Sequence, residues 1–171
     1  MPEIPLFITG KEKNVYQLLN GTKYTVDYFQ REYKWQPKNI IELLEDLSEK
    51  FLSHYDESHE WHQVERYGHY FLGSIVISRK DGKSFIVDGQ QRLTSLTLLL
   101  IYLHNLQSKR SDQIPVENLI FSEKFGQKSF NLDIPERIPC LEAIWNHGLQ
   151  GRQRARPPAQ EGKNYRSTRH D

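Results

Sequence analysis

The chain has 171 residues, a formal net charge of +1 and a single cysteine, Cys140. This length suits one domain with a core of ordinary size, and the near-neutral charge excludes a basic field over the whole surface. One cysteine excludes an internal disulfide, and the first residues lack the basic start and long apolar core of a signal peptide. The composition therefore predicts a soluble cytoplasmic protein.

The first part of the chain predicts two helices and a strand. Residues 14–20 indicate a short helical turn that Gly21 ends, and residues 23–28 alternate enough for a strand. Pro37 suits the first position of a helix, and apolar residues recur after it at helical spacing up to Leu52. We expect this helix to turn the following side chains toward the core: Ile40, Leu44, Leu47 and Phe51.

Residues 54–69 are polar and rich in histidine, which indicates a surface segment. His59 and His62 have a spacing that zinc sites use, but no cysteine lies nearby and no second ligand pair follows. Asp46, on the acidic face of the preceding helix, is a metal ligand only if a partner lies at a defined distance. A solvated surface is the simpler interpretation of both features.

A hairpin followed by a long helix forms the centre of the predicted fold. Residues 70–78 and 85–87 have strand character and flank Lys80-Asp81-Gly82-Lys83, a strong hairpin turn. The leucine-rich helix that follows runs to Leu106 and is apolar nearly all round, so it should be buried. Because it is short and interrupted by polar residues, it cannot span a bilayer, and no membrane association is expected.

Polar groups gather where this strand ends and the helix begins, in Asp88-Gly89-Gln90-Gln91-Arg92. In a structural interpretation, Asp88 caps the helix and Gln91 reaches back to complete a capping box. That interpretation leaves Arg92 near the positive end of the helix dipole, at a cost of about 0.3–1 kcal/mol. Unpaired amides, a glycine, two side-chain amides and a guanidinium together favour a phosphate site.

A second Gln-Arg pair, Gln30-Arg31, lies in the aromatic segment 28–35. The aromatic rings of this segment suit a core or a lid, and Arg31 has Glu32 beside it as an alternative partner. Two guanidiniums that converge on one anion are what a triphosphate requires. We therefore expect Gln30 and Arg31 to face residues 88–92.

The sequence still looks globular between residues 118 and 147. It predicts short strands at 119–121 and 130–132 and the start of a helix at 140–145. If the chain breaks off there, Leu141, Ile144 and Trp145 should be exposed.

The composition changes at Gly148. From there to Asp171 six basic residues face two acidic ones, and no aliphatic residue larger than alanine follows Leu149. A basic arm for nucleic acid is one interpretation. The interpretation we favour divides the chain into a domain over 1–147, incomplete at its C-terminal end, and a disordered tail over 148–171 of a truncated or frameshifted gene product.

Three sequence blocks resemble the N-terminal domain of GmrSD-type restriction endonucleases. They are Tyr28-Phe-Gln-Arg-Glu-Tyr-Lys-Trp35, Tyr70-Phe-Leu-Gly-Ser-Ile-Val76 and Val87-Asp-Gly-Gln-Gln-Arg-Leu-Thr94, and a weaker resemblance runs to about residue 147. The resemblance implies an α+β, ParB/sulfiredoxin-like fold, with a small β-sheet and a hairpin that leads into a central buried helix. It also implies a domain that binds and hydrolyses a nucleoside triphosphate and works beside a nuclease in defence against phage DNA.

By this resemblance, the candidate site residues fall into two overlapping sets. Catalytic roles would belong to Asp88, Gln90, Gln91 and Arg92, and cofactor binding to Gln30, Arg31, Gly89, Gln91 and Arg92. Asp88 would hold Mg²⁺ or orient water, and the arginines would neutralise phosphate charge.

The chain has no room for the family's nuclease half, so DNA would be reached through a nuclease partner or a missing C-terminal nuclease domain. The alternative function is a non-catalytic module that senses nucleotide or DNA, or an inactive gene fragment. Redox chemistry of the sulfiredoxin type is disfavoured, because no cysteine lies in the motif.

Overall fold

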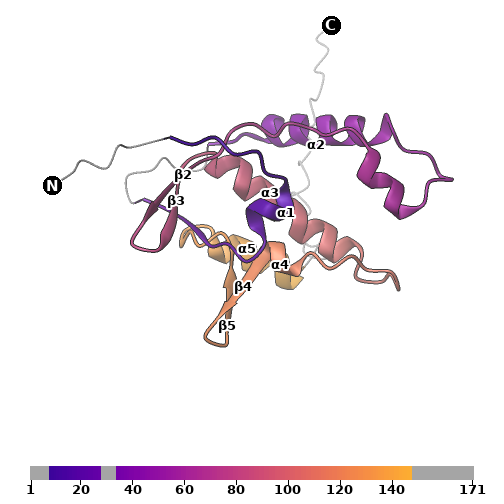
Figure 1. The fold of residues 1–171 in the computed structure, drawn as a ribbon. Coiled ribbons are helices and arrows are strands. Elements are labelled where there is room, and N and C mark those ends of the chain that lie inside the picture. The colour runs from indigo at the N-terminus through magenta and orange to yellow at the C-terminus, as the bar shows by residue number, and fades with distance from the viewer. Residues whose placement is uncertain (1–7, 28–33, 148–171) are drawn as a thin grey trace, which may run out of the picture.

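The computed structural model describes residues 8–27 and 34–147, which form a mixed α+β domain with small sheets and several helices (Figure 1). This fold class agrees with the prediction. In chain order the elements are α1 (Val15–Leu19), β1 (Tyr24–Val26), α2 (Pro37–Leu52), the 3₁₀ helix η1 (Trp61–Arg66), β2 (Val76–Lys80), β3 (Lys83–Asp88), α3 (Gln90–Leu106), α4 (Glu117–Ile120), β4 (Phe121–Lys124), β5 (Gln127–Phe130) and α5 (Ile138–His147). Within the described ranges, no helix combines the length and apolarity that crossing a membrane requires.

A three-stranded sheet has the order β1-β3-β2. β1 pairs with β3 in parallel, and β2 is antiparallel to β3. Asp81 and Gly82 connect β2 to β3 with φ angles of 52° and 72°. Positive φ at both central residues is what a tight hairpin turn requires, and Asp-Gly is a favoured pair for it. The predicted hairpin is confirmed.

The first strand of this hairpin is shorter than predicted. β2 begins at Val76, and residues 70–75 are not in a strand. Gly73 has a φ of 95°, which interrupts an extended strand, and the Ser74 carbonyl accepts a hydrogen bond from the side chain of Arg92. The segment is therefore bound to the start of α3 instead of extending the sheet.

The N-terminal elements lie where the sequence predicts them. The side chain of Asn14 accepts a hydrogen bond from the Gln17 amide, and the Gln17 side chain accepts one from the Asn14 amide, so a capping box starts α1. β1 also pairs with the segment after β5, because the Tyr24 amide donates to Asn131 O and the Asp133 amide donates to Tyr24 O. β1 thereby connects the two halves of the domain.

α3 runs through the middle of the domain (Figure 1), and its first half is buried. Leu93 packs in the core cluster beneath the three-stranded sheet, and Ile101 packs in a second cluster with Leu141 of α5. In the second half of α3, Leu103 and Leu106 are exposed. The predicted burial is thus right for the first half of this helix and for Ile101, and wrong for Leu103 and Leu106.

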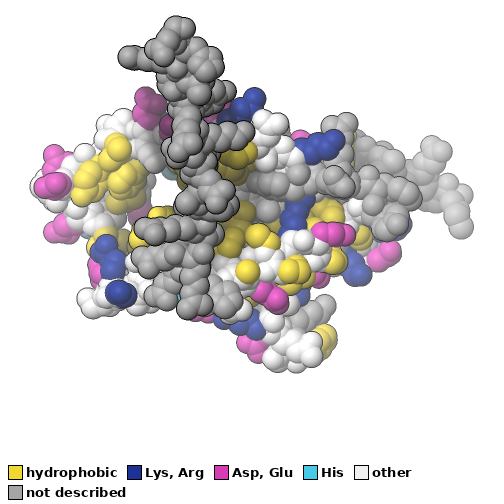
Figure 2. Space-filling model, turned by 180° about the vertical axis from the view of Figure 1, so that it is seen from behind, with side chains coloured by type: hydrophobic (Ala, Val, Ile, Leu, Met, Phe, Trp, Pro, Cys, Tyr) yellow, Lys and Arg dark blue, Asp and Glu magenta, His cyan; other side chains and the backbone are white. Residues whose placement is uncertain are grey.

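α2 has the predicted bounds, and its inward face agrees with the prediction only in part. Ile40 and Leu47 are half-buried, in line with the prediction, and Leu43 is buried. Leu44 and Phe51, which the sequence also predicts to face the core, are 40% and 42% exposed. The Tyr70 hydroxyl donates a 2.6 Å hydrogen bond to Asp46, which turns the side of α2 that carries Leu43 inward. The space-filling view shows apolar side chains on the surface of the domain (Figure 2).

The strands predicted at 119–121 and 130–132 are displaced. Residues 117–120 form α4, and the two strands of the β4–β5 hairpin meet at a turn formed by Phe125 and Gly126. The sequence lacks a favoured turn pair here, so the position of the hairpin was not predictable from local chemistry.

α5 packs against α3 and the β4–β5 hairpin. Leu141 is 1% exposed, Ile144 is half-buried, and the Trp145 ring stacks on His104 with 4.5 Å between ring centroids. The prediction that Leu141, Ile144 and Trp145 are exposed is therefore wrong. The apolar face of this helix is covered within the described part of the chain.

Candidate functional site

The turn between β3 and α3 is formed differently from the predicted capping box. Gly89, with a φ of 90°, is the N-cap residue, while Asp88 is the last residue of β3 and its side chain is exposed. Asp88 stays extended because it is paired with Val76 across the hairpin. The predicted cap by Asp88 and its capping box with Gln91 are therefore wrong.

Gly89 fits this turn for a steric reason. A Cβ atom at this position would lie 2.9 Å from Cγ1 of Ile75, and the positive φ disfavours any other residue. The N-cap residue Gly89 has no side chain that could itself cap α3. A helix start attracts anions, because the amide hydrogens of the first turn point out of the helix end and carry the positive end of its dipole.

The side chain of Arg92 is fixed beside this helix start. Its Nη1 donates a 2.9 Å hydrogen bond to the carbonyl of Ser74. The guanidinium lies against Gly73, where an added Cβ would come within 3.0 Å of Arg92 Cζ. Gly73 thus permits the close approach of Arg92 to the backbone.

Gln91 contacts the end of the aromatic segment 28–35. Its Oε1 accepts a 3.3 Å hydrogen bond from the amide of Lys34. Gln30 and Arg31, which were predicted to face residues 88–92, lie outside the described residues, so their position stays a prediction. The contact with Lys34 nevertheless brings the described end of their segment to the start of α3.

Gln90 accepts a hydrogen bond from Arg137, which the sequence analysis did not identify as a site residue. Arg137, just before α5, donates from Nη2 to Gln90 Oε1 at 2.8 Å and from Nη1 to Thr94 Oγ1. Thr94 is buried and donates in turn to Gln90 O at 2.7 Å. Gln90 therefore joins α3 to the C-terminal part of the domain. Its partner lies 47 residues away, and nothing in the local sequence identifies it.

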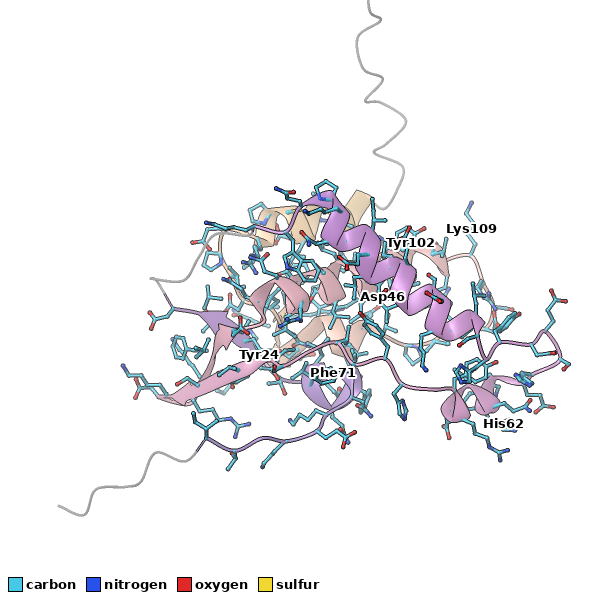
Figure 3. The ribbon with its side chains drawn as sticks, turned by 90° about the horizontal axis from the view of Figure 1, so that it is seen from above. Tyr24, Asp46, His62, Phe71, Tyr102 and Lys109 are labelled. Atoms are coloured by element: carbon cyan, nitrogen blue, oxygen red, sulfur yellow. The ribbon has the colours of Figure 1, made fainter. Side chains whose placement is uncertain are left out.

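A pocket of about 260 Å³ lies beside Arg92. Its walls come from α2, from Trp35, which lies two residues before this helix, from the segment that precedes β2, and from α3. The lining residues are Trp35, Asn39, Glu42, Leu43, Asp46, Tyr70, Leu72 and Arg92. The three sequence blocks 28–35, 70–76 and 87–94 therefore meet at one pocket, and Figure 3 labels Asp46 on α2.

The pocket has charges of both signs. Arg92 supplies a guanidinium, and Glu42 and Asp46 supply carboxylates one turn apart on α2. The hydrogen bond to Asp46 raises the pKa of the Tyr70 hydroxyl, with burial and the charges of Asp46 and Glu42 acting in the same direction. Tyr70 is therefore a donor at neutral pH, and it occupies one oxygen of Asp46.

Metal ligation by the described residues alone is not indicated. No three His, Cys, Asp or Glu side chains among them are grouped closely enough to hold an ion. His59 contacts the Tyr67 hydroxyl, and His62 contacts the carboxylate of Glu60, so the two histidines have separate partners. A metal here would need ligand atoms from a bound molecule, such as phosphate oxygens.

Comparison with known proteins identifies the family. The sequence model described as the GmrSD restriction endonuclease, N-terminal domain, matches residues 15–169. This range contains the three blocks that meet at the pocket and extends past residue 147, beyond the part that the structure describes. A comparison with curated proteins gave no match. Because the family match covers nearly the whole chain, this protein belongs to the GmrSD restriction endonuclease N-terminal domain family.

Proposed function

We propose that this domain binds and hydrolyses a nucleoside triphosphate as a component of a phage-defence restriction system. The phosphates would lie at the start of α3, and the rest of the nucleotide would enter the pocket beside Arg92. The observation that carries the proposal is the position of Arg92, which lines this pocket directly beside the start of α3, where the N-cap residue is a glycine.

The electrostatics of Arg92 favour an anionic ligand. The guanidinium is half-buried, donates to the neutral carbonyl of Ser74, and forms no ion pair with a carboxylate of the described residues. A partly buried charge near the positive end of a helix dipole is unfavourable unless an anion accompanies it. A phosphate at this position would accept hydrogen bonds from the guanidinium and would lie at the positive end of the helix dipole.

The pocket supplies room for the nucleoside. Its volume of about 260 Å³ is slightly below the range of ordinary ligand pockets, about 300–1,000 Å³. Trp35 offers an aromatic ring, and Glu42 offers a carboxylate that can accept hydrogen bonds from a base or a ribose. In the same proposal, Gln30 and Arg31 contact the phosphates from the opposite side.

Asp88 fits a role with Mg²⁺ better than a role as a cap. Its side chain is exposed at the end of β3, next to Gly89. Mg²⁺ in nucleotide sites is commonly held by one or two carboxylates together with substrate phosphates, so one aspartate suffices. Bound there, the ion would offset phosphate charge. Gln91 and Arg92 would position the phosphates, while Gln90 would support them through Arg137.

The finer fold assignment belongs to the same proposal. We infer a ParB/sulfiredoxin-like arrangement over residues 1–147, supported by the hairpin that leads into the buried first half of α3. A cytoplasmic location and a nuclease, either as a partner or as a further domain, would complete the system. The family match supports this context.

The proposal is tested by measuring nucleotide affinity and phosphate release for each of the four nucleoside triphosphates with Mg²⁺. Arg92→Ala should weaken binding about ten- to a hundredfold, because hydrogen bonds to charged groups are worth about 1.5–3 kcal/mol. Arg110→Ala is the control, since Arg110 is exposed and pairs with Asp112. Equal affinity in Arg92→Ala and parent would place Arg92 outside the site. Binding without phosphate release would leave a nucleotide-sensing module and exclude hydrolysis.

A further inference from the structure

The helix α2 has apolar residues on two sides but buries only one of them. Leu43 is the one buried residue among its 16, and Ile40 and Leu47 are half-buried beside it. Helices in proteins draw most of their stability from packing of an apolar face, and α2 packs little of its surface against the domain. A contact on the outer side of α2 would therefore stabilise the helix.

The outer side of α2 carries an exposed apolar stripe, interrupted by one serine. Its members follow one another at steps of three or four residues, which places them along one side of a helix. They are Ile41, Leu44, the exposed Ser48, Phe51 and Leu52, and the four apolar ones are 53%, 40%, 42% and 63% exposed. Figure 1 shows α2 along the upper edge of the domain. An apolar surface of this kind marks a site of protein contact, whereas single exposed apolar residues do not.

Aromatic contacts fix the C-terminal end of this outer stripe. The ring of Phe51 stacks on Tyr55 with 5.3 Å between ring centroids, and it meets the ring of Tyr67 at 5.5 Å. Leu52 beside it stays largely exposed. A surface that is already ordered loses little conformational entropy when a partner binds.

The pocket beside Arg92 lies on another side of α2. Asn39, Leu43 and Asp46 line that pocket, and their steps of four and three residues place them on one side of the helix, away from the outer stripe. A partner on the stripe therefore does not compete with a ligand in the pocket.

Acidic residues border the outer stripe. Glu45 and Glu49 lie one turn apart beside it, and both are exposed. Neither belongs to an ion pair among the described residues. Of the two lysines of α2, Lys38 lies at its N-terminal end, and the side chain of Lys50 lies against Gly68. The border is therefore negative along the middle of the stripe.

We propose that the outer stripe is a docking surface for an amphipathic helix of another protein, one whose apolar face is bordered by lysine or arginine. The apolar side chains of this partner pack on Ile41, Leu44 and Leu52, and its basic side chains pair with Glu45 and Glu49. From Ile41 to Leu52 the stripe spans about three helical turns, which suits a partner helix of ordinary length.

Two other occupants complement this surface less well. A second copy of the chain would bring the same carboxylates to the contact, where like charges repel. Residues 148–171 are basic, but after Leu149 they contain no aliphatic residue larger than alanine, so they cannot fill an apolar stripe. A basic amphipathic helix complements both the apolar side chains and the charge.

The first test measures binding of a labelled synthetic helix to the full chain by fluorescence anisotropy. The probe is a peptide of about four helical turns with leucine on one face and lysine beside it, and its counterpart has glutamate in place of lysine. The lysine peptide should bind, and the glutamate peptide should bind at least about tenfold more weakly because its charge repels the border.

The second test removes the apolar contact. Ile41→Gln with Leu52→Gln should weaken binding of the lysine peptide at least about tenfold, as loss of central contact residues does. Both side chains are more than half exposed, so the melting temperature should not fall. The control is Leu103→Gln with Leu106→Gln, which removes two exposed leucines of α3 and should leave binding unchanged.

The third test removes the charges. Glu45→Gln with Glu49→Gln should weaken binding of the lysine peptide and flatten its dependence on salt, because the ion pairs that salt screens are gone. These exposed positions carry no packing, so the fold should not change.

The proposal is overturned if the parent binds neither peptide, if it binds both equally, or if the affinity is unchanged in Ile41→Gln with Leu52→Gln. Self-association of the chain that the same variant abolishes would assign the stripe to a second copy. Binding that appears only after residues 148–171 are removed would assign it to that segment. Each of these two results would also exclude a separate partner.

Discussion

Gly73 combines a positive φ angle with close contact between its backbone and the guanidinium of Arg92. We predict that Gly73→Ala destabilises the fold and also weakens nucleotide binding, because the new Cβ would lie 3.0 Å from Arg92 Cζ and displace the guanidinium. Gly82→Ala is the matched control. Gly82 has a φ of 72°, but nothing lies within 4 Å of the added Cβ, so this variant costs only the backbone term of about 1–2 kcal/mol.

The comparison requires urea unfolding and nucleotide titration of both variants. Gly73→Ala should lose more stability than Gly82→Ala, and it alone should lose affinity. If Gly73→Ala retains the affinity of the parent, the position of Arg92 does not matter for the ligand.

A substitution at Asp88 should affect catalysis without affecting the stability of the fold. Because Asp88 does not cap α3 and its side chain is exposed, Asp88→Asn should leave the melting temperature unchanged. If Asp88 holds Mg²⁺ or orients water, the same change should lower phosphate release by orders of magnitude. Equal turnover in the two proteins would end the catalytic proposal for this residue.

Sequence reasoning succeeded at single residues where the relevant chemistry is local. The Asp81-Gly82 turn satisfies its own backbone requirements, and the helical turn predicted at residues 14–20 is present as α1. Sequence reasoning failed at Asp88, because the N-cap is Gly89, which packs closely against Ile75 in the segment before β2. A capping pattern in the sequence does not reveal that contact.

Among the connections between elements, the one made by Arg137 should matter most for stability. Arg137→Met keeps the length of the side chain but leaves Gln90 Oε1 and the buried Thr94 without this donor. We expect a loss of about 1–3 kcal/mol in the free energy of unfolding, measured in urea. Arg110→Met removes an exposed ion pair and should cost less than about 1 kcal/mol. Similar losses in the two variants would mean that Arg137 does not hold α3 to the region of α5.

For the helices and strands, the bounds were more predictable from the sequence than the side that each helix buries. Pro37 and Leu52 bound α2 as expected, but apolar residues on two sides of this helix fit helical spacing. The bond between Tyr70 and Asp46, which selects the side with Leu43, joins residues 24 positions apart. Helical periodicity therefore predicted the helix and, through Ile40 and Leu47, only part of its inward face.

For the whole molecule, the fold explains why three separated sequence blocks resemble one family. Each contributes to the pocket beside Arg92: Trp35 from the first, Tyr70 and Leu72 from the second, and Arg92 from the third. The sequence predicted that the first and third blocks converge. It did not predict the contribution of α2 through Glu42 and Asp46, because a carboxylate on an amphipathic helix looks like any solvated charge.

The last prediction concerns residues 148–171, which contain no aliphatic residue larger than alanine after Leu149. A segment with so little to bury cannot offset about 1–2 kcal/mol of backbone entropy per ordered residue. Deleting it should leave the melting temperature of the domain unchanged, because α5 already covers its own apolar face against α3. Calorimetry of the shortened and full chains measures this directly. Limited proteolysis should cut after the arginines of this segment, beginning with Arg152. A clear fall in melting temperature, together with protection of Arg152, would mean that the segment covers apolar surface that the described residues expose, such as Leu103 and Leu106 of α3.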